Sequence, residues 1–435
     1  MAKRMVAIIG RQNVGKSTLL NRLAGRRLAI TSDIPGTTRD RIFADVSFGG
    51  KDFTAVDTGG LVADPKAGLE LDVTSQVEMA MGEADLIIFL VDARTGLTAL
   101  DEDIARRLRR VAKPVLLVVN KVEDTLERAA LPEFYKLAFG EPIPISAYHR
   151  VGIEGLLEKI TGLLPETQER EPLADVMKLA IVGRPGVGKS MLLNAILDRE
   201  RAIIGDKPGT TRDAVDMLFD FGGQSVLIID TAGIRRQGQV AQGIERYSVL
   251  RTFKAIEGCD VALLVMDATE VPTAQDTHIA GYIQQALKGM VLIVNKWDLV
   301  PAKDAASYGA VIRERFKFVS YAPLLFISAK TKEGVEKVMP LARGVFQERK
   351  RSLSADELNK VVNLAVKMHA PPRIKGKALK FLGATQKGVN PPSFVLRVSD
   401  PNLVHFSYRR YLENRLRESF GFTGTPIQLV FERGR

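Results

Sequence analysis

The stretch that decides the fold is Gly10-Arg11-Gln12-Asn13-Val14-Gly15-Lys16-Ser17, which returns as Gly183-Arg184-Pro185-Gly186-Val187-Gly188-Lys189-Ser190. Both copies follow the pattern G-x-x-x-x-G-K-S of a phosphate-binding loop, or P-loop. The glycines let successive backbone N–H groups face phosphate oxygens. The lysine adds positive charge at the terminal phosphates, and the serine hydroxyl is a ligand for Mg²⁺. The two copies therefore predict two nucleotide-binding domains.

Two further motifs recur at the same spacing as the P-loops. Pro35-Gly36-Thr37-Thr38-Arg39-Asp40 returns as Pro208-Gly209-Thr210-Thr211-Arg212-Asp213, and Asp57-Thr58-Gly59-Gly60 returns as Asp230-Thr231-Ala232-Gly233. The displacement is 173 positions each time, as from Gly10 to Gly183. Asn120-Lys121 and Asn295-Lys296 are 175 positions apart, so the second copy has gained two residues by that point. A repeat of this length is a whole domain, not a solenoid unit.

Apolar runs of strand length alternate with helical patterns in both copies. Residues 6–9 and 179–182 lead into the P-loops, and a helical pattern follows each loop. Later runs of the same kind are 86–91, 115–119, 261–266 and 290–294. Near-continuous apolar strands indicate a parallel sheet with helices on both faces. We expect an α/β fold with two P-loop domains in tandem, residues 1–164 and 176–346, joined by a linker at 165–175.

The last segment, residues 347–435, has the order helix, strand, strand, helix, strand, over 358–368, 378–384, 394–398, 408–420 and 427–431. This order fits a KH-like α/β domain. An RNA-clamping KH module needs a G-x-x-G loop between helices. The match Gly421-Phe422-Thr423-Gly424 follows the last helix instead, so we interpret it as a turn. Both rRNA contact through Lys and Arg and a purely domain-packing role stay open. We expect His405 in the packing of this domain.

Positive charge is concentrated in that last segment. The chain of 435 residues carries a net charge of +11, and residues 351–435 hold 15 Lys or Arg against 6 Asp or Glu. This excess favours a polyanionic partner, with a merely solvated surface as the alternative. The single cysteine, Cys259, excludes an intramolecular disulfide, and no apolar stretch approaches the ~20 residues of a membrane span. We expect a cytoplasmic monomer with Cys259 in a core.

Carboxylates follow a strand at the matching point of both copies. Asp57 and Asp230 each end an apolar run, where a carboxylate can hold Mg²⁺ through water. The N–H of Gly60 or Gly233 can reach the γ-phosphate and sense whether it is present. One threonine of the first switch loop is expected to bind Mg²⁺. Thr38 and Thr211 are the candidates, with Thr37 and Thr210 as the alternatives. The predicted protein ligands of Mg²⁺ are Ser17, Thr38, Asp57, Ser190, Thr211 and Asp230.

The base-recognition motif favours guanine over adenine. Guanine offers two donors, N1–H and the 2-amino group, which one carboxylate can accept together. Asn295-Lys296-Trp297-Asp298 supplies that carboxylate in the second copy, and Ser328-Ala329-Lys330 can add a backbone N–H to the guanine oxygen. The first copy has Asn120-Lys121-Val122-Glu123, followed later by Ser146-Ala147. Glu123 has the right charge but one extra methylene, and Asp124 stands beside it. We predict GTP and GDP as ligands of two G domains.

These motifs together resemble the bacterial Der (EngA) family. The P-G-T-T-R-D first switch, the N-K-W-D of the second copy and the run from Asp400-Pro401-Asn402 to Arg415-Leu416-Arg417 carry the resemblance, as does Phe420-Gly421-Phe422-Thr423-Gly424-Thr425-Pro426-Ile427. The resemblance covers essentially the whole chain. It implies a GTPase needed for maturation of the large (50S) ribosomal subunit, with a KH-like third domain packed against both G domains.

The same resemblance implies a bound K⁺ in place of an arginine finger, coordinated partly by a P-loop asparagine. Asn13 occupies that position in the first domain, whereas the second has Gly186; Gln12 stands where the family usually has proline. Small GTPases often place a glutamine after D-x-x-G to orient water, but Leu61 and Ile234 stand here. We expect K⁺ in the first domain, which keeps hydrolysis and reads guanine less tightly. The residues expected to act in catalysis are Asn13, Lys16, Thr38, Lys189 and Thr211.

Two functions fit this sequence. In the first, GTP hydrolysis resets the binding of the protein to the large ribosomal subunit, through rRNA and ribosomal proteins. In the second, the protein is a nucleotide-loaded assembly scaffold whose hydrolysis is incidental. A regulatory protein is kept open as a further partner.

Overall fold

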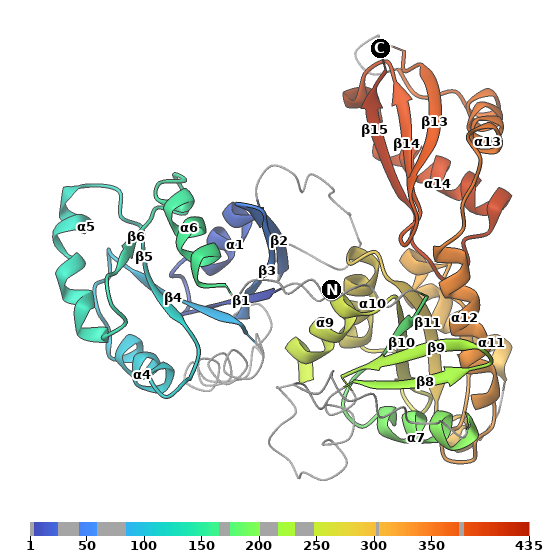
Figure 1. Cartoon of the computed structure of the whole chain (residues 1–435), viewed down its shortest axis with the longest axis horizontal. Helices are drawn as coiled ribbons and strands as arrows, with labels where there is room; N and C mark the ends of the chain where they lie inside the picture. Colours follow the sequence, from blue (N-terminus) through green and yellow to red (C-terminus); the bar gives the residue numbers. More distant parts are fainter. Residues whose placement is uncertain are drawn as a thin grey trace. The chain divides into compact units, whose positions relative to one another are not determined.

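The computed structural model (Figure 1) describes residues 4–24, 43–58, 84–164, 175–200, 216–230, 248–301, 304–373 and 378–434. The chain divides into two compact units, Met1–Pro172 with Ala241–Arg251 and Leu173–Val240 with Thr252–Arg435, and each unit is described by itself. The predicted linker lies outside the described residues, except for Asp175.

A six-stranded sheet in the order β2-β3-β1-β4-β5-β6 forms the centre of the first G domain. Its strands pair in parallel, apart from the antiparallel pair β2–β3. The elements are β1 (Arg4–Ile9), α1 (Lys16–Leu23), β2 (Phe43–Phe48), β3 (Lys51–Asp57), β4 (Leu86–Asp92), α4 (Ala99–Leu108), β5 (Val115–Asn120), α5 (Thr125–Ala129), the 3₁₀ helix η1 (Leu131–Leu137), β6 (Ile143–Pro144) and α6 (Ile153–Leu163).

Helices cover both faces of this sheet, as the apolar strands predict. Every residue of β4 is buried, and a strand buried on both faces needs apolar side chains in both directions. Residues of α1 and α6 form one core with one face, while α4 and η1 form a second core with the other. The two layers can be followed in Figure 1. All loops that leave the carboxyl ends of the parallel strands therefore meet at one edge of the sheet.

The second G domain repeats this topology, with the sheet order β8-β9-β7-β10-β11-β12. Its elements are β7 (Met177–Val182), α7 (Lys189–Glu200), β8 (Met217–Phe221), β9 (Gln224–Ile229), α9 (Ser248–Gly258), β10 (Val261–Asp267), α10 (Ala274–Gln285), β11 (Gly289–Asn295), η3 (Trp297–Leu299), α11 (Ala305–Arg315), η4 (Lys317–Val319), β12 (Leu324–Phe326), η5 (Val335–Lys337) and α12 (Val338–Arg349). Cys259 is a buried core residue, as predicted, and burial raises the pKa of its thiol to about 12.

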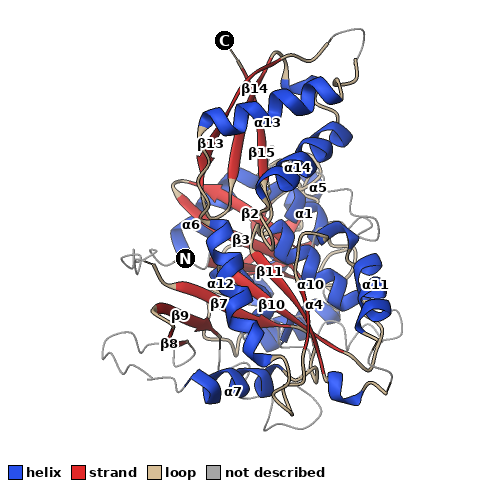
Figure 2. Cartoon of the chain, turned by 90° about the vertical axis from the view of Figure 1, so that its right-hand side faces the viewer, coloured by secondary structure: helices blue, strands red, loops and turns tan. Residues whose placement is uncertain are grey.

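The C-terminal segment has the predicted order of elements. They are α13 (Ala355–Met368), β13 (Phe381–Gly388), β14 (Ser393–Val398), η6 (Pro401–Leu403), α14 (Phe406–Phe420) and β15 (Gln428–Arg433). Residues of both long helices share one core with the three-stranded sheet β13-β14-β15, and Figure 2 shows the helices beside the strands. This is the KH-like domain that the sequence predicts. Among the described residues, no helix combines the length and the apolar character needed to cross a membrane.

The position of His405 differs from the sequence-based expectation. Its side chain is exposed, and its ring nitrogen Nδ1 accepts a hydrogen bond from the backbone N–H of Ser407 at the start of α14. At the N-cap of α14 this side chain satisfies an otherwise unpaired N–H instead of packing in the core, so the expected core role was wrong.

A buried arginine joins the C-terminal domain to the second G domain. Arg349, at the end of α12, is 2% exposed. Its Nη1 donates to the carbonyl of Leu287 (2.8 Å), and its Nε donates to Oδ1 of Asn390 in the C-terminal domain (2.7 Å). Burial lowers the pKa of this guanidinium. Since leaving either partner unpaired in such a place is unfavourable, these bonds fix the two domains to each other.

The turn predicted at 421–424 forms the other half of this junction. The N–H of Gly424 donates to the carbonyl of Tyr321 (2.8 Å), and the carbonyl of Gly424 accepts from the N–H of Met290 (2.7 Å). Arg417 lies over the Tyr321 ring, 4.1 Å from its centroid. The second G domain and the C-terminal domain therefore form a specific, hydrogen-bonded interface, as the family resemblance implies for this pair.

Replacing Gly424 should disrupt that interface. Gly424 has φ +72°, and a Cβ there would lie 2.3 Å from Cγ2 of Val345. We expect Gly424→Ala to lower the free energy of unfolding by about 2 kcal/mol, measured by urea denaturation with the fluorescence of the single tryptophan, Trp297. Gly388→Ala is the matched control, because a Cβ there meets nothing within 4 Å. Equal stability of the two variants would contradict this account of the turn.

Candidate functional site

Each P-loop passes so close to a neighbouring strand that its first position accepts only glycine. A Cβ on Gly10 would lie 2.3 Å from the carbonyl oxygen of Leu90, and a Cβ on Gly183 would lie 2.3 Å from that of Val265. No Cβ is found at such a distance from a backbone atom, so the first glycine lets the loop approach the central strand. The loop then opens at the carboxyl edge of the sheet, where ligands of such folds bind.

The P-loop lysines are buried and bonded to backbone carbonyls. Lys16 Nζ donates to the carbonyls of Gly10 (2.8 Å) and Arg11 (2.9 Å), and Lys189 Nζ makes the same two bonds in the second copy. Lys16 is 8% and Lys189 is 7% exposed. Burial lowers the pKa of Lys189 to about 8. An anionic phosphate beside this amine would stabilise its charged form, so the loop is built for a negatively charged ligand.

Two of the three predicted Mg²⁺ ligands of the first domain, Ser17 and Asp57, lie together. Ser17 Oγ, at the start of α1, donates to Oδ2 of Asp57, which ends β3, at 2.5 Å. Asp57 is 2% exposed. One hydroxyl and one carboxylate, completed by water and phosphate oxygens, suit Mg²⁺. In the second domain Ser190 lies at the start of α7 and Asp230 directly after β9.

One asparagine side chain in each domain ties three loops together. Asn120 Nδ2 donates to the carbonyl of Val14 in the P-loop (2.8 Å), while its Oδ1 accepts the N–H of Ala147 (3.0 Å). Asn295 makes the matching bonds in the second domain: it donates to the carbonyl of Val187 (2.9 Å) and accepts the N–H of Ala329 (2.9 Å). Each asparagine therefore connects the P-loop of its domain to the loop that holds Ala147 or Ala329. The side chains of Val14 and Val187 themselves lie in the cores.

The second P-loop glycine is required by this asparagine. A Cβ on Gly15 would lie 2.4 Å from Nδ2 of Asn120, and one on Gly188 would lie 2.3 Å from Nδ2 of Asn295. Both glycines also have left-handed backbone, with φ +99° and +95°. The glycine and the asparagine are thus in direct contact, although they are 105 positions apart in the first domain and 107 in the second.

Sequence reasoning missed the aspartates that hold the next lysine. Lys121 Nζ donates to Oδ2 of Asp92 at the end of β4 (2.6 Å), and Lys296 Nζ donates to Oδ2 of Asp267 at the end of β10 (2.5 Å). Burial is the largest single influence and would raise the pKa of Asp92, but the hydrogen bonds from Lys121 and from the backbone of Arg94, together with the charge of Lys121, outweigh it and the pKa is lowered. The signal that could have found them was Asp92-Ala93 and Asp267-Ala268, which recur 175 positions apart.

The P-loop arginines are also held by buried carboxylates. Arg184 Nε lies 3.1 Å from both carboxylate oxygens of Asp276, and Arg11 Nε lies 3.4 Å from Oδ2 of Asp101. Both aspartates are fully buried and close a capping box at the start of the following helix, α10 or α4. Arg184 is therefore hydrogen-bonded to α10, and Arg11 forms the matching ion pair with α4, a role beyond the nucleotide contact that the motif predicts.

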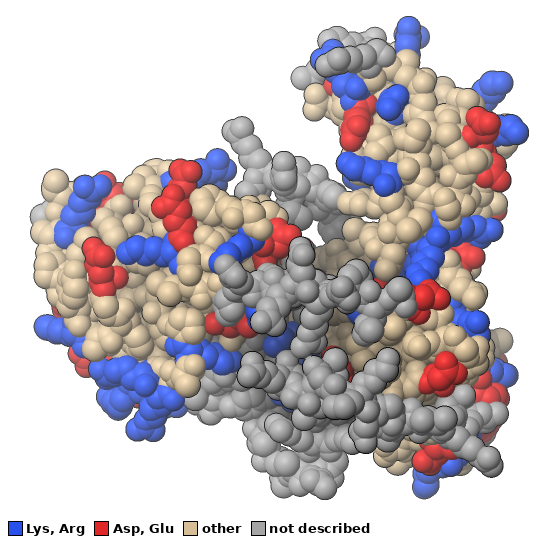
Figure 3. Space-filling model, in the orientation of Figure 1, with Lys and Arg blue, Asp and Glu red and all other residues tan. Residues whose placement is uncertain are grey.

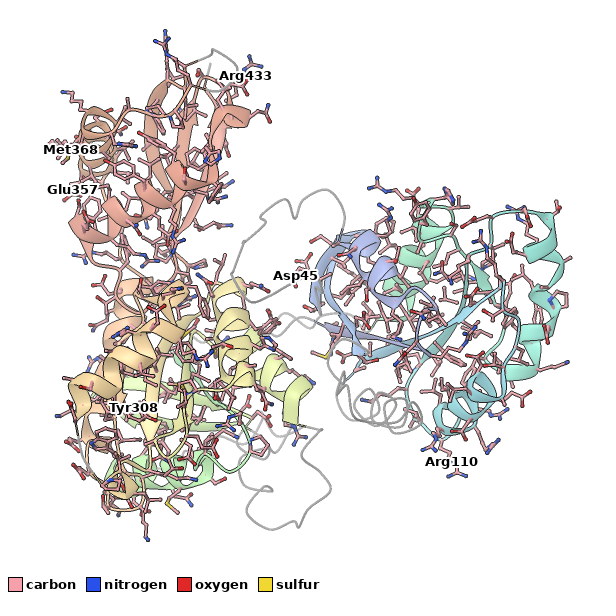
Figure 4. All side chains as sticks on the ribbon, turned by 180° about the vertical axis from the view of Figure 1, so that it is seen from behind. Asp45, Arg110, Tyr308, Glu357, Met368 and Arg433 are labelled. Atoms are coloured by element: carbon pink, nitrogen blue, oxygen red, sulfur yellow. The ribbon has the colours of Figure 1, made fainter. Side chains whose placement is uncertain are left out.

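The base-recognition loop of the second domain has an available carboxylate. Asp298 forms no hydrogen bond or ion pair with any residue that the structure describes. The preceding Trp297 packs against the rings of Phe326 (centroids 4.5 Å apart) and Tyr308 (5.5 Å). Tyr308, labelled in Figure 4, donates its hydroxyl to the carbonyl of Ala268 (2.8 Å). These aromatic contacts hold the loop, while Lys330 on the facing loop is exposed.

Glu123, the matching residue of the first domain, already accepts hydrogen bonds from protein side chains. Its Oε2 accepts a hydrogen bond from Arg94 and its Oε1 accepts one from Ser146 Oγ (3.3 Å). His149 Nε2 lies 3.6 Å from Oε2. The two domains thus present different surroundings for the carboxylate that we predict to read guanine.

Asn13 and Gly186 have the same backbone conformation. Their φ values are +63° and +78°, in the left-handed region where asparagine is the best tolerated residue after glycine. Both residues are exposed, as is Gln12, and Pro185 is half-buried. A Cβ on Gly186 would meet nothing within 4 Å, so the second P-loop has room for the asparagine of the first.

Several predicted residues cannot be placed, because they lie outside the described residues. Thr58, which precedes them, is buried and donates to the carbonyl of Ile8 (2.8 Å). The predicted residues outside the described ranges are Thr37, Thr38, Gly59, Gly60, Leu61, Thr210, Thr211, Thr231, Ala232, Gly233 and Ile234.

Comparison with known proteins gives matches along the whole chain. A family model described as a 50S ribosome-binding GTPase matches residues 5–121 and 178–296. A second model, described as the C-terminal KH-domain-like part of EngA bacterial GTPase enzymes, matches residues 353–432. The family models therefore divide the chain as the repeat and the C-terminal segment do.

Individual relatives match over their full length. GTPase Der of Moorella thermoacetica is 50% identical over 437 residues, covering 100% of both chains. GTPase Der of Caldanaerobacter subterraneus subsp. tengcongensis is 50% identical over 431 residues, covering 98% of both. A crystal structure of Era with MgGDPNP and nucleotides 1506–1542 of 16S ribosomal RNA is 20% identical with a TM-score of 0.31, covering 59% of this chain and 92% of that one. A likeness at that level supports no inference about the site.

Proposed function

The chain belongs to the GTPase Der family and is an enzyme that hydrolyses GTP, and from this premise we propose that it acts in maturation of the large (50S) ribosomal subunit. In this proposal the protein is a cytoplasmic monomer, and GTP hydrolysis resets its binding to rRNA and ribosomal proteins of that subunit. The observation that carries the proposal is the combination of two complete P-loop sites with a basic KH-like domain on one chain.

Different residues of each site contact the phosphates, Mg²⁺ and the guanine base. Lys16 and Lys189 have a third N–H donor for phosphate oxygens beside their two carbonyl bonds, while Asn120 and Asn295 keep the P-loop and the base-recognition loop in register. Ser17 and Asp57, with Ser190 and Asp230 in the second domain, fit Mg²⁺, which neutralises charge on the phosphates when bound. We assign the remaining ligands to Thr38 and Thr211. Glu123 and Asp298 accept the two donors of guanine.

We assign a K⁺ site to the first domain, on the side chain of Asn13. The exposed amide at a left-handed P-loop position offers a carbonyl oxygen, the kind of ligand that a hard monovalent cation accepts. Gly186 offers no side chain at the same place. The first domain would then hydrolyse GTP in a K⁺-dependent manner, and the second would bind GTP and hydrolyse it slowly.

Exchanging these two residues tests the assignment in the full chain. We expect Asn13→Gly to remove most of the difference in GTP turnover between KCl and NaCl. Gly186→Asn should increase turnover in KCl by about tenfold, less than the roughly hundredfold that a fully preorganised electrostatic group contributes, because the loop has room for the side chain. Unchanged K⁺ dependence in both variants would contradict the assignment.

The basic surface of the C-terminal domain supports the ribosomal partner. Figure 3 shows Lys and Arg side chains scattered over the visible face of this domain, together with some Asp and Glu. Several are exposed and form no ion pair with any residue in the described ranges: Lys367, Arg373, Lys387, Arg397 and Arg410. Unpaired cations of this kind release counterions on meeting phosphate, which makes the binding of RNA sensitive to salt.

Binding to purified subunits tests the proposed partner. We expect the full chain with a non-hydrolysable GTP analogue to bind 50S subunits more tightly than the GDP form, and 30S subunits weakly. Replacing Lys387 and Arg397 by Gln should reduce the slope of log affinity against log salt by about one for each phosphate that the variant no longer neutralises.

Variants of the P-loop lysines distinguish a protein whose ribosome binding is reset by GTP hydrolysis from a nucleotide-loaded scaffold. Lys16→Ala and Lys189→Ala should abolish the advantage of the GTP analogue in 50S binding. If hydrolysis is incidental, as the scaffold alternative holds, wild-type protein would bind 50S subunits equally well with GTP, GDP and the analogue.

A further inference from the structure

The glutamate of the first base-recognition loop lies in a network of charged side chains. Arg94, two residues after the end of β4, donates from Nη2 to Glu123 Oε2. Ser146 Oγ donates to Glu123 Oε1 at 3.3 Å. Glu123 is 25% exposed at its side chain, and Arg94 is 54% exposed. Both carboxylate oxygens of Glu123 therefore have a donor from a different element.

Glu127 connects the same arginine to the backbone of the loop. Arg94 Nε donates to Glu127 Oε1 at 3.2 Å. The other oxygen, Oε2, accepts the backbone N–H groups of Glu123 (3.2 Å) and Asp124 (2.8 Å). The side chain of Glu127 is only 13% exposed. One carboxylate thus fixes the main chain at Glu123 and also fixes the guanidinium that holds the Glu123 side chain.

The part of the second domain that the structure describes contains no such network. The residue that corresponds to Arg94 is Thr269, which donates from Oγ1 to Asp267 Oδ1 at 2.7 Å. Asp298 has no hydrogen-bond or ion-pair partner within the described ranges of the chain. The arginine is therefore found in the domain with the longer acid, and it is absent where a shorter aspartate stands.

The extra methylene explains why a longer acid needs support. A glutamate side chain has one more rotatable bond than aspartate, so holding its carboxylate in one place costs more conformational entropy. A carboxylate offers about four lone-pair positions. Arg94 and Ser146 occupy one on each oxygen, which leaves one on each oxygen for the N1–H and the 2-amino group of guanine. Arginine stays protonated at all relevant pH values, so Arg94 remains a hydrogen-bond donor to Glu123.

We propose that Arg94, braced by Glu127, is a positioning residue that orients Glu123 toward guanine and lets a glutamate perform the task of aspartate in the first domain. The inference rests on the proposed guanine-reading role of Glu123 and adds the specificity-determining residue behind it. Arg94 acts on guanine through Glu123, not through direct contact with the base.

The test compares GDP with IDP, whose base lacks the 2-amino group. Both affinities are measured by calorimetry on the full chain carrying Lys189→Ala, so that the first site dominates binding. We expect Arg94→Thr, which copies Thr269, to weaken GDP binding about fivefold and IDP binding less, so that the GDP to IDP preference falls. Arg106→Thr is the matched control, because Arg106 is an exposed arginine on α4 paired with Asp103, and it should leave both affinities unchanged.

Two variants of Glu123 separate this inference from the proposal beneath it. Glu123→Ala should lower the GDP to IDP preference; if it does not, the guanine-reading role of Glu123 fails. In a Glu123→Asp background the shorter side chain no longer needs Arg94, so Arg94→Thr should have no further effect.

Two results would overturn the role of Arg94 alone. Tighter GDP binding by Arg94→Thr would mean that the arginine competes with the base. An unchanged GDP to IDP preference, in a protein where Glu123→Ala lowers it, would mean that Arg94 and Glu123 form only a surface ion pair.

Discussion

The structure of each nucleotide site depends on one buried asparagine side chain. Asn120 and Asn295 are 3% and 2% exposed, and each bonds with its amide to two other loops. Leaving such a buried amide unpaired would cost about 1–3 kcal/mol for each missing partner. The P-loop, the base-recognition loop and the loop that holds Ser146-Ala147 or Ser328-Ala329 are all anchored to this group, so they cannot move independently. The closeness of the loops in turn requires glycine at positions 15 and 188.

Much of this arrangement follows from the sequence, because the decisive motifs are local. A P-loop carries its own strand, turn and helix within about fifteen residues, so Gly10–Ser17 predicts a domain and Gly183–Ser190 predicts a second one. The KH-like order of elements was also predictable from amphipathic patterns. His405 was placed wrongly because the apolar residues on either side of it indicated packing, whereas its position before α14 made it a cap.

What the sequence does not reveal are contacts between residues far apart in the chain. No local pattern links Arg349 to Asn390, or Arg94 to Glu123 and Glu127. Asp92 and Asp267 had a signal in the repeat, but their partners, Lys121 and Lys296, follow the next strand of the sheet. The pairing of parallel strands brings such residues together, and that pairing is a property of the fold. The switch residues stay predictions, since they lie outside the described residues.

The two G domains share one scaffold and differ in the groups that surround the ligand. Glu123 is held by charged neighbours while Asp298 is available, and Asn13 corresponds to Gly186 at the same left-handed position. These differences affect the two ends of the nucleotide separately, because one concerns the base and the other the phosphates. A repeat of this kind allows one chain to bind two molecules of the same nucleotide with different affinity and turnover.

The most direct test of this account is the number of GDP molecules bound per full-length chain, measured by calorimetry before and after removal of one asparagine side chain. We predict two GDP molecules for the wild type. Asn295→Ala should eliminate or strongly weaken one site and leave the other at its original affinity, and Asn120→Ala should do the reverse. Binding of a single GDP by the wild type, or full retention of both sites in each variant, would contradict the claim that each asparagine assembles its own site.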